Sequence, residues 1–388
     1  MKKFTVDIDQ TVLEDLKDRL KRTRWPADLD NEDWSYGTNR EYLQSLTDYW
    51  LNEYDWLAQQ KKLNSFDHFI ATVDDYPIHF IREKATGPAP IPLILTHGWP
   101  WTFWDYHKII RPLADPASFG GDPADAFEVI VPSLPGFGFS TPVPRSGMNY
   151  WRTADLWDLF MRQTLGFERY AAQGGDWGAV ITSQMSHAHP QHLIGIHVTN
   201  AVGPGLFSQE RPWDMLGSRI RALPEEKQAA AIELERRVAS HVAVAILDPQ
   251  TISYAMQDSP VGLLAWIIER RKAWSDPAED FESEETKNHM LTTAMIFWAS
   301  GCFVSSSRFY ADTDRYPWRP SHERQPAFEA PAGISLFLND RASLRGPERI
   351  ANYNVVQLKE HEKGGHFAPY ENPEAVLEDI RSTFRQLR

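Results

Sequence analysis

The run Gly174-Gly175-Asp176-Trp177-Gly178 constrains the fold of this chain more than any other segment. A short apolar segment, 170–173, precedes it, and a helical pattern, 179–188, follows it. Small residues two positions before and after Asp176 permit a sharp turn from strand to helix, which lifts the central side chain out of the backbone. An aspartate here could instead cap the helix. The glycines and the flanking patterns favour the sharp turn, known as a nucleophile elbow.

The central side chain of this turn is a carboxylate, and that limits the chemistry it can perform. With a reference pKa of ~3.9, an aspartate is ionised at neutral pH and needs no partner base to act as a nucleophile. We therefore expect Asp176 to attack a saturated carbon that carries a good or strained leaving group.

Short apolar runs separated by helix-length segments surround the elbow, a pattern typical of buried parallel strands. The runs cover 92–96, 127–131, 193–199, 334–338 and 355–358, and an amphipathic helix is expected at 373–387. This alternation predicts an α/β fold with a doubly wound, mostly parallel sheet. Ligands of such sheets bind at the carboxyl ends of the strands, so we expect the site there.

Two stretches depart from the alternation. The first has helical patterns at 225–244, 262–274 and 287–301, and we expect it to form a helical cap over the site. The second lies near the N-terminus, with helical patterns at 9–24 and 40–62 and a hairpin pattern at 69–81. The predicted parts are an N-terminal extension (1–88) packing on core and cap, a core (89–203 and 320–388) and the cap (204–319).

Charge and cysteine content exclude several classes of function. The 388 residues carry a net charge of −13 with no lysine- or arginine-rich block, which argues against nucleic acid or an anionic membrane as partner. The single cysteine, Cys302, rules out an internal disulfide framework and fits a reducing compartment. No apolar stretch approaches the ~20 residues of a membrane span. We expect a cytoplasmic protein without a membrane anchor.

A second motif, His97-Gly98-Trp99-Pro100, follows the predicted strand that ends at Thr96. It could be a simple strand-ending turn. As a functional element it supplies the backbone N–H of Trp99, which together with that of Trp177 would form an oxyanion hole. We expect His97 to be a structural hydrogen-bonding residue.

A base and an acid can be placed by chain order. His366 lies in a glycine-rich loop after the last predicted strand, where a nucleophile–acid–base order requires the base. Asp340 follows the strand 334–338 and would orient the imidazole and stabilise its charged form. Glu362 is the alternative acid. No cluster has metal-ligand spacing, so neither a metal nor an organic cofactor is expected.

These motifs together resemble one family over nearly the whole chain, the microsomal-type epoxide hydrolases of the α/β-hydrolase superfamily. The residues that carry the resemblance are Trp34-Ser35-Tyr36-Gly37, Asn52-Glu53-Tyr54-Asp55-Trp56, His97-Gly98-Trp99-Pro100, Pro132-Ser133-Leu134-Pro135-Gly136-Phe137-Gly138-Phe139-Ser140, the elbow, Asp258-Ser259-Pro260-Val261-Gly262, Ser307-Arg308-Phe309-Tyr310 and Gly364-Gly365-His366-Phe367. The resemblance implies an α/β-hydrolase fold with a helical cap and an N-terminal helical extension. Because the membrane-anchoring helix of the animal members has no counterpart, it also implies a soluble, bacterial form.

The resemblance further implies the roles of individual residues. Asp176 would be the nucleophile, His366 the base and Asp340 the charge-relay acid. The family holds the epoxide oxygen with two cap tyrosines, of which Tyr310 matches one. An ungapped count back from Asp258 places His241 at the other position, and Ala245 stands where a glutamine is usual.

The implied reaction converts an epoxide to a vicinal diol through a covalent aspartyl ester, with water as the second reactant. Many tryptophans indicate a bulky or aromatic epoxide, and Trp101, Trp104 and Trp266 are the candidate pocket residues. The expected partners are the epoxide and water, and a homodimer is compatible with the sequence.

Two alternatives stay open at this stage. A haloalkane dehalogenase-like hydrolase shares the aspartate elbow and the tryptophan after it, but holds a halide with indole N–H groups. Tyr310 and the N-terminal segment favour the epoxide over the halide. A catalytically silent binding protein of the same fold is the second alternative, against which the set of Asp176, Asp340 and His366 argues.

Overall fold

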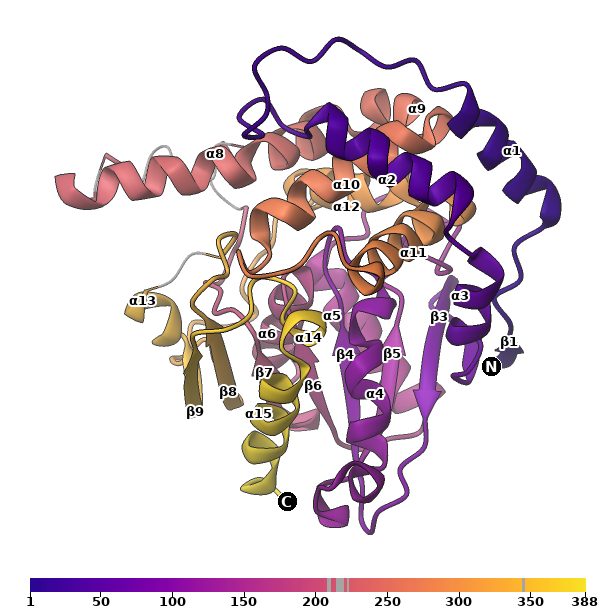
Figure 1. The fold of residues 1–388 in the computed structure, drawn as a ribbon. Helices are drawn as coiled ribbons and strands as arrows, with labels where there is room; N and C mark the ends of the chain where they lie inside the picture. The colour runs from indigo at the N-terminus through magenta and orange to yellow at the C-terminus, as the bar shows by residue number, and fades with distance from the viewer. Residues whose placement is uncertain (208–210, 214–219, 222, 344–345) are drawn as a thin grey trace.

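A nine-stranded sheet forms the centre of the computed structural model, which describes residues 1–207, 211–213, 220–221, 223–343 and 346–388 (Figure 1). The strands are β1 (Lys2–Phe4), β2 (His68–Val73), β3 (Tyr76–Glu83), β4 (Ile91–Thr96), β5 (Phe127–Pro132), β6 (Tyr170–Gly174), β7 (Leu193–Val198), β8 (Phe328–Phe337) and β9 (Tyr353–His361). Their order in the sheet is β1-β2-β3-β5-β4-β6-β7-β8-β9. The first three strands pair antiparallel and the rest pair parallel, which confirms the predicted, mostly parallel sheet.

Helices cover both faces of this sheet. On one face, α4 (His107–Ala114) packs against α15 (Pro373–Arg385), and on the other α5 (Tyr150–Leu159) packs against α6 (Trp177–Ala188). The central strands β4, β5 and β6 are almost wholly buried because both of their faces lie under helices. This explains why their sequences are continuous apolar runs and do not alternate.

Among the residues that the structure describes, five helices between β7 and β8 lie over the carboxyl ends of the strands (Figure 1). They are α8 (Glu225–Leu247), α9 (Pro249–Asp258), α10 (Pro260–Trp274), α11 (Glu284–Ser300) and α12 (Phe303–Arg315). The three predicted helices correspond to α8, α10 and α11. The helices α9 and α12 were not predicted individually, although α12 carries Tyr310.

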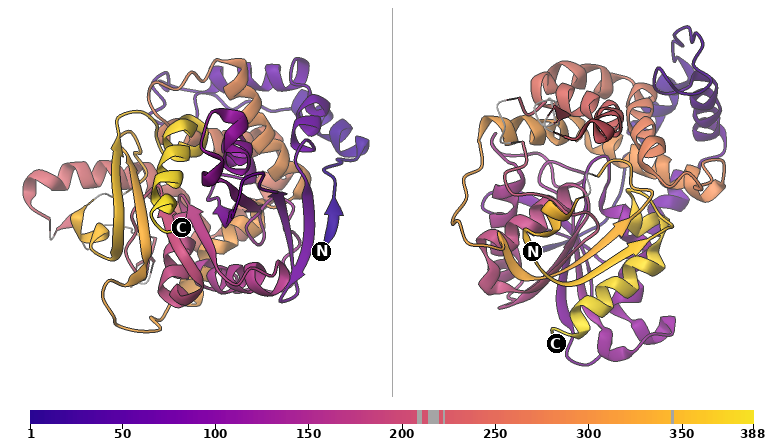
Figure 2. Two further views of the ribbon diagram at one scale, coloured as in Figure 1. Left: turned by 90° about the horizontal axis from the view of Figure 1, so that it is seen from below. Right: turned by 90° about the vertical axis from the view of Figure 1, so that its left-hand side faces the viewer.

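The N-terminal helices are α1 (Gln10–Lys21), α2 (Arg40–Asn52) and α3 (Trp56–Leu63). The prediction of a single helix over 40–62 is wrong, because the helix stops after Asn52 and restarts at Trp56. Asp55 caps the new helix by accepting the Ala58 N–H at 3.1 Å, which competes with a continuous helix. Figure 2 shows these helices beside the cap, where Thr38 donates to the Ala265 carbonyl at 2.8 Å.

The predicted hairpin is formed by β2 and β3, which pair from His68–Ile81 to Val73–Tyr76. Its two turn residues, Asp74 and Asp75, have φ of 46° and 69°. Positive φ at both central positions is the geometry whose twist matches that of paired strands, and aspartate tolerates it better than most residues. The hairpin extends the sheet toward the N-terminal edge.

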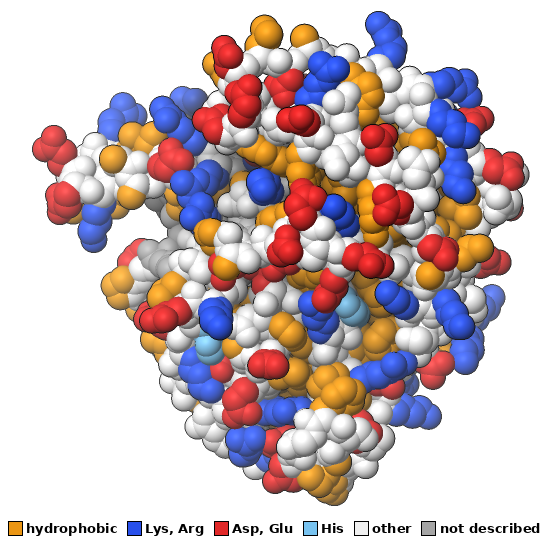
Figure 3. Space-filling model, in the orientation of Figure 1, with side chains coloured by type: hydrophobic (Ala, Val, Ile, Leu, Met, Phe, Trp, Pro, Cys, Tyr) orange, Lys and Arg blue, Asp and Glu red, His pale blue; other side chains and the backbone are white. Residues whose placement is uncertain are grey.

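The surface mixes both signs of charge. Figure 3 shows acidic and basic side chains interspersed over the visible face, although the chain as a whole carries −13. Within the described ranges, no single helix is long and apolar enough to cross a membrane. The pair α11 and α12 passes that test of length and composition jointly, but it is bent by 86°.

Candidate active site

The predicted elbow is formed where β6 ends and α6 begins. Asp176 occupies it with φ of 54° and ψ of −125°, a strained conformation for a residue with a side chain. Its backbone N–H donates to Asn200 Oδ1 at 2.9 Å. A Cβ at Gly178 would lie 1.8 Å from the Thr96 carbonyl oxygen, and one at Gly98 would lie 2.2 Å from Asp176 Oδ1. The close approach of the turn to the loop after β4 therefore requires glycine at both positions.

Each oxygen of the Asp176 carboxylate faces a different group. The Trp99 backbone N–H donates to Oδ1 at 2.7 Å, while His366 Nε2 lies 3.2 Å from Oδ2. Trp177 contributes no backbone hydrogen bond to this carboxylate among the described residues. Its N–H is nevertheless a first-turn amide of α6, which has no partner within the helix. Of the two backbone N–H groups expected to form an oxyanion hole, that of Trp99 contacts the Asp176 carboxylate.

The second carboxylate beside His366 belongs to Asp340, in the loop after β8. His366 Nδ1 lies 3.1 Å from Asp340 Oδ1, and the same oxygen accepts the Ala342 and Ser343 N–H groups at 2.9 and 3.1 Å. Both side chains are buried, whereas Glu362 is exposed. The structure therefore brings Asp340, and not Glu362, to the imidazole.

Electrostatics in this line of three groups favour a charged imidazole. Burial opposes the protonated form of His366, but the Asp340 and Asp176 carboxylates outweigh it and raise its pKa to about 10. Burial likewise opposes the charged form of Asp340, yet the imidazole and the two loop hydrogen bonds keep its pKa below the usual value. The raised pKa of His366 favours an imidazolium between the Asp340 and Asp176 side chains at neutral pH.

Tyr310 and His241 are cap residues whose side chains lie next to each other near Asp176. Their Oη and Nε2 atoms are 3.3 Å apart, from α12 and α8 respectively. The Tyr310 ring lies edge-on to Trp177 with centroids 4.7 Å apart, and the His241 ring stacks on Trp99 at 4.9 Å. His241, which was identified by counting back from Asp258, thus lies beside Tyr310.

Burial sets the protonation of both groups. Burial and the nearby Asp176 charge raise the pKa of Tyr310 well above its ordinary value, so the phenol keeps its proton. Burial and the Arg270 guanidinium lower the pKa of His241 well below its ordinary value, so this imidazole is neutral. A protonated phenol and a neutral imidazole can each donate one hydrogen bond.

A cavity of about 100 Å³ joins these groups. Asp176, His366, Tyr310 and His241 all line it. The remaining wall is mainly apolar and is formed by Trp177, Val180, Ala201, Val202, Leu206, Phe207, Val238, Val242, Trp274 and Ala342, with Asn200, Ser343 and Arg349 as polar members. The catalytic candidates therefore share one largely apolar space beneath the cap.

None of the three predicted pocket tryptophans lines this cavity. Trp101 is fully buried behind it, edge-on to His366 at 5.5 Å. Trp104 stacks on His107 at 4.4 Å and lines a different pocket, and Trp266 packs under the Arg270 guanidinium. The cavity indoles are Trp177 and Trp274, and Trp274 was missed because helix packing decides which face of α10 turns inward.

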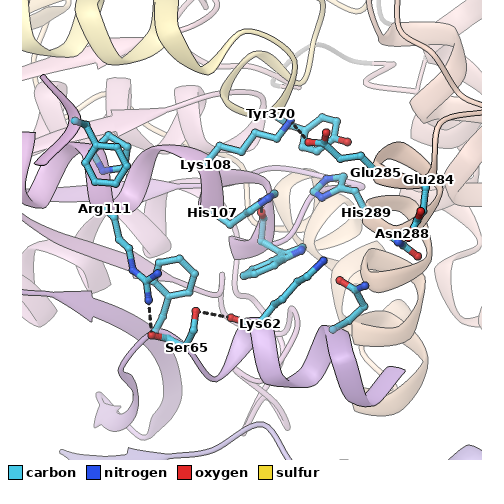
Figure 4. A pocket seen from close by; sticks show the side chains of 15 residues that line it. Lys62, Ser65, His107, Lys108, Arg111, Glu284, Glu285, Asn288, His289 and Tyr370 are labelled. Atoms are coloured by element: carbon cyan, nitrogen blue, oxygen red, sulfur yellow. Dashed lines mark hydrogen bonds and ion pairs between the residues drawn. The ribbon is translucent and has the colours of Figure 1, made fainter. Parts of the chain in front are cut away.

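A separate pocket of about 670 Å³ lies between α3, α4 and α11 (Figure 4). Its wall includes Lys62, His107, Lys108, His289 and Tyr370, and none of the catalytic candidates. It is therefore distinct from the Asp176 cavity.

One group of side chains could offer ligands to a metal ion. Asp158, His189 and His192 have ligand atoms within 4.8 Å of one another. The fold brings two segments together here, which is why spacing along the sequence gave no sign of it. The group lies at the far end of α6 from Asp176, about 18 Å away at 1.5 Å per residue. It is too distant to act on the reaction at the elbow.

The fold and the site define an α/β hydrolase with an aspartate at the elbow, and comparisons with known proteins agree. The "alpha/beta hydrolase fold" family matches residues 91–221, and the "Epoxide hydrolase N terminus" family matches residues 1–106. Epoxide hydrolase 1 of Oryctolagus cuniculus is 33% identical over 400 residues, covering 97% of this chain and 87% of that protein. A Stigmatella aurantiaca protein, provisionally named an epoxide hydrolase, is 37% identical over 390 residues, covering 99% of this chain and 85% of that one.

A solved structure extends the similarity to three dimensions. The juvenile hormone epoxide hydrolase from the silkworm Bombyx mori superposes with a TM-score of 0.80 at 28% identity, covering 100% of this chain and 94% of that one. The chain therefore belongs to the epoxide hydrolase family, and it is a hydrolase that acts on epoxides. The expected fold class, with its helical cap and N-terminal helical extension, is confirmed.

Proposed function

We propose that this chain converts an epoxide to a vicinal diol through an ester on Asp176. The observation that carries the proposal is the line from Asp176 through His366 to Asp340, with distances of 3.2 and 3.1 Å, opposite Tyr310 in one cavity. This arrangement supplies a nucleophile, a base and a proton donor to the same small space.

In the first step, Asp176 Oδ2 bonds to a ring carbon as the carbon–oxygen bond of the epoxide breaks. Tyr310 donates its proton to the released oxygen; its raised pKa keeps the phenol protonated until the more basic alkoxide develops. Esterification removes the Asp176 charge, so the pKa of His366 falls and the imidazole gives up its extra proton. That proton restores Tyr310. The step therefore starts from a carboxylate and an imidazolium and ends with a neutral ester, a neutral imidazole and an alcohol.

In the second step, the neutral His366 takes a proton from a water molecule, whose oxygen bonds to Cγ of the ester. The developing oxyanion is Oδ1, which already accepts the Trp99 N–H at 2.7 Å. We assign the Trp177 N–H as the second donor. The bond between Cγ and Oδ2 then breaks, and Oδ2 takes the second proton of the attacking water to complete the diol. The site returns to a carboxylate beside an imidazolium.

His241 stands where the family has a second tyrosine, and we propose that it supports Tyr310. With a hydrogen on Nε2, the neutral imidazole donates to Tyr310 Oη, 3.3 Å away. The phenol hydrogen then remains free to point at the epoxide oxygen. Stacking against Trp99 fixes the plane of the His241 ring in this direction.

The cavity wall supports an epoxide with an apolar, aromatic substituent as the substrate. Trp177, Phe207 and Trp274 supply aromatic faces, and the valines of α6 and α8 supply aliphatic contacts. An epoxide panel read by chiral analysis of the diols would identify the preferred substituent.

A single turnover in heavy-oxygen water tests the covalent route directly. The expected first diol contains the unlabelled Oδ2 of Asp176, and Asp176 gains one heavy oxygen from water. A first diol with a solvent oxygen and an unlabelled Asp176 would contradict the ester and favour direct attack by water.

A further inference from the structure

The loop that carries His366 is bound by two acidic side chains outside the catalytic set. We propose that Glu371 and Asp276 are positioning residues, which aim His366 at the water that hydrolyses the ester. The inference rests on the covalent route proposed above, because it assigns a role in the second step of that route.

Each of four consecutive backbone N–H groups in this loop has an acceptor within the protein. The Gly364 N–H donates to Asp276 Oδ2 at 2.6 Å, and the His366 N–H donates to the Trp274 carbonyl at 2.9 Å. The two remaining N–H groups share the Glu371 carboxylate: Gly365 donates to Oε2 at 2.6 Å and Phe367 donates to Oε1 at 3.1 Å. No N–H in the run 364–367 depends on water, so the backbone on both sides of His366 is fixed.

The same two carboxylates connect the loop to the cap and to the acid. Glu371 Oε2 also accepts the Asp276 N–H at 2.8 Å, just beyond the end of α10. Asp276 Oδ2 also accepts from Asn339 Nδ2 at 3.0 Å, and Asn339 precedes Asp340. These hydrogen bonds connect the loop that carries His366, the loop that carries Asp340 and the end of α10.

Close packing supports this arrangement. A Cβ at Gly365 would lie 2.4 Å from Asp276 N and 2.8 Å from Glu371 Oε2, so the loop backbone touches both partners. Nearby, the Arg271 guanidinium lies 3.9 Å from the centre of the Phe367 ring. The α10 end therefore contacts the His366 loop through backbone, carboxylate and ring.

The two chemical steps depend on this loop to different degrees. The bonds made and broken in ester formation involve Asp176 and Tyr310, which lie on other elements, and His366 only returns a proton to Tyr310 afterwards. Ester hydrolysis needs His366 Nε2 within hydrogen-bond reach of a water that can attack Cγ, and a displacement of about 1 Å can cost on the order of 10²-fold in rate. Exchanging the Glu371 carboxylate for an amide turns one acceptor into a donor that faces backbone N–H groups.

The test compares Glu371→Gln and Asp276→Asn with the control variant Asp158→Asn. Asp158 is a buried carboxylate near the end of α6 that is far from Asp176, and it accepts hydrogen bonds from Tyr170 and His192. Rapid quenching and mass spectrometry of the Asp176 peptide give the rates of ester formation and hydrolysis separately. In Glu371→Gln we expect normal ester formation and hydrolysis slowed on the order of 10²-fold. KM falls together with kcat because the ester accumulates. Asp276→Asn has a smaller effect, and Glu371→Asp recovers part of the rate.

Three outcomes separate the possibilities. Slow hydrolysis with normal ester formation in both loop variants, and neither change in Asp158→Asn, supports the positioning role. A wild-type ester that both loop variants hydrolyse at the normal rate overturns this inference alone. The absence of any ester in the wild-type enzyme overturns the covalent route, and this inference with it.

Discussion

His366 Nε2 lies 3.2 Å from Asp176 Oδ2, so the proposed base and the proposed nucleophile form an ion pair in the resting protein. An imidazolium cannot accept a proton, and this base is therefore inactive while Asp176 is a free carboxylate. Esterification removes one of the two charges that hold its proton, and the base becomes available when a substrate for hydrolysis has formed. The order of the two steps thus follows from the charge balance of the site.

Replacing Asp176 by asparagine should reproduce the charge of the esterified state. In Asp176→Asn, only Asp340 opposes the effect of burial, so the pKa of His366 falls from about 10 toward its ordinary range. NMR titration of the imidazole nitrogens measures this directly, and turnover should be lost. An unchanged pKa of His366 would mean that Asp176 does not hold its proton.

The same pairing makes a prediction about stability and pH. The folded pKa of His366 is raised above the unfolded value of ~6.5, so its ion pairs stabilise the fold fully below that pH and lose this contribution as pH rises through about 10. The difference in unfolding free energy between wild type and Asp176→Asn should therefore be largest near pH 6, shrink steadily above about pH 6.5 and be nearly gone at about pH 10. Urea titrations at a series of pH values give this difference. A difference that grows between pH 6 and pH 10 would contradict the assignment.

Removing the phenol of Tyr310 should slow ring opening and leave ester hydrolysis unchanged. Without a proton donor the alkoxide is a poor leaving group, and Tyr310→Phe should reduce the rate of ester formation ~10²- to 10⁴-fold. His241→Phe should have a smaller effect, about 10-fold, because its hydrogen bond acts through Tyr310. Tyr316→Phe, just beyond the end of α12 and outside the cavity lining, is the matched control. Ester accumulation in Tyr310→Phe would show that Tyr310 acts in ester hydrolysis and would contradict its assignment to ring opening.

The parts that the sequence revealed are those with local determinants. The elbow was predictable because its glycines, its preceding strand and its following helix lie within about 20 residues of one another. Asp340 was preferred to Glu362 on chain order, and the burial of one and exposure of the other agree with that preference. His366 could be placed for the same reason.

The parts that were missed depend on contacts between distant segments. Whether Trp266 or Trp274 turns into the cavity depends on how α10 packs, and the two residues lie on the same predicted helix. The break between α2 and α3 was missed because aromatic residues continue through it, although Asp55 is a usable capping signal. Glu371 has no motif of its own, and its role became visible only from the N–H groups that converge on it.

A buried ion pair beneath the cap should dominate the response of the fold to single substitutions. Arg271 lies 2.5 Å from Asp105, both are buried, and His289 Nε2 lies 3.1 Å from the same oxygen. Arg271→Met leaves the Asp105 charge buried without a cationic partner, with only the neutral His289 imidazole and the Thr102 N–H beside it, at a cost of about 3–5 kcal/mol in unfolding free energy. Arg22→Met breaks an exposed pair with Asp18 and should cost under about 1 kcal/mol.

The pH dependence of this pair has the opposite sign to that of His366. Burial opposes the charge of Asp105, but Arg271 and His289 hold its pKa below the usual value. The ionised Asp105 carboxylate therefore contributes to the stability of the fold above the unfolded pKa of ~3.9, and this contribution is lost as pH falls below that value. The difference in unfolding free energy between wild type and Arg271→Met, measured by urea unfolding, should persist at pH 7 and become smaller below pH 4. Equal losses of unfolding free energy in Arg271→Met and Arg22→Met would show that the buried ion pair matters no more to stability than the exposed one.

Filling the cavity from α8 should separate large from small epoxides. Val238 is buried and lines the cavity, so Val238→Phe should remove room for an aromatic substituent and raise KM for aryl epoxides about 10-fold, a loss of about 1.4 kcal/mol. An epoxide with a single methyl substituent should be little affected, because it needs only the space next to Asp176. Ile232→Phe, on the same helix but 41% exposed, adds a similar side chain outside the cavity and should change neither value. An equal rise in KM for both epoxides in Val238→Phe would mean that the substituent does not lie against α8.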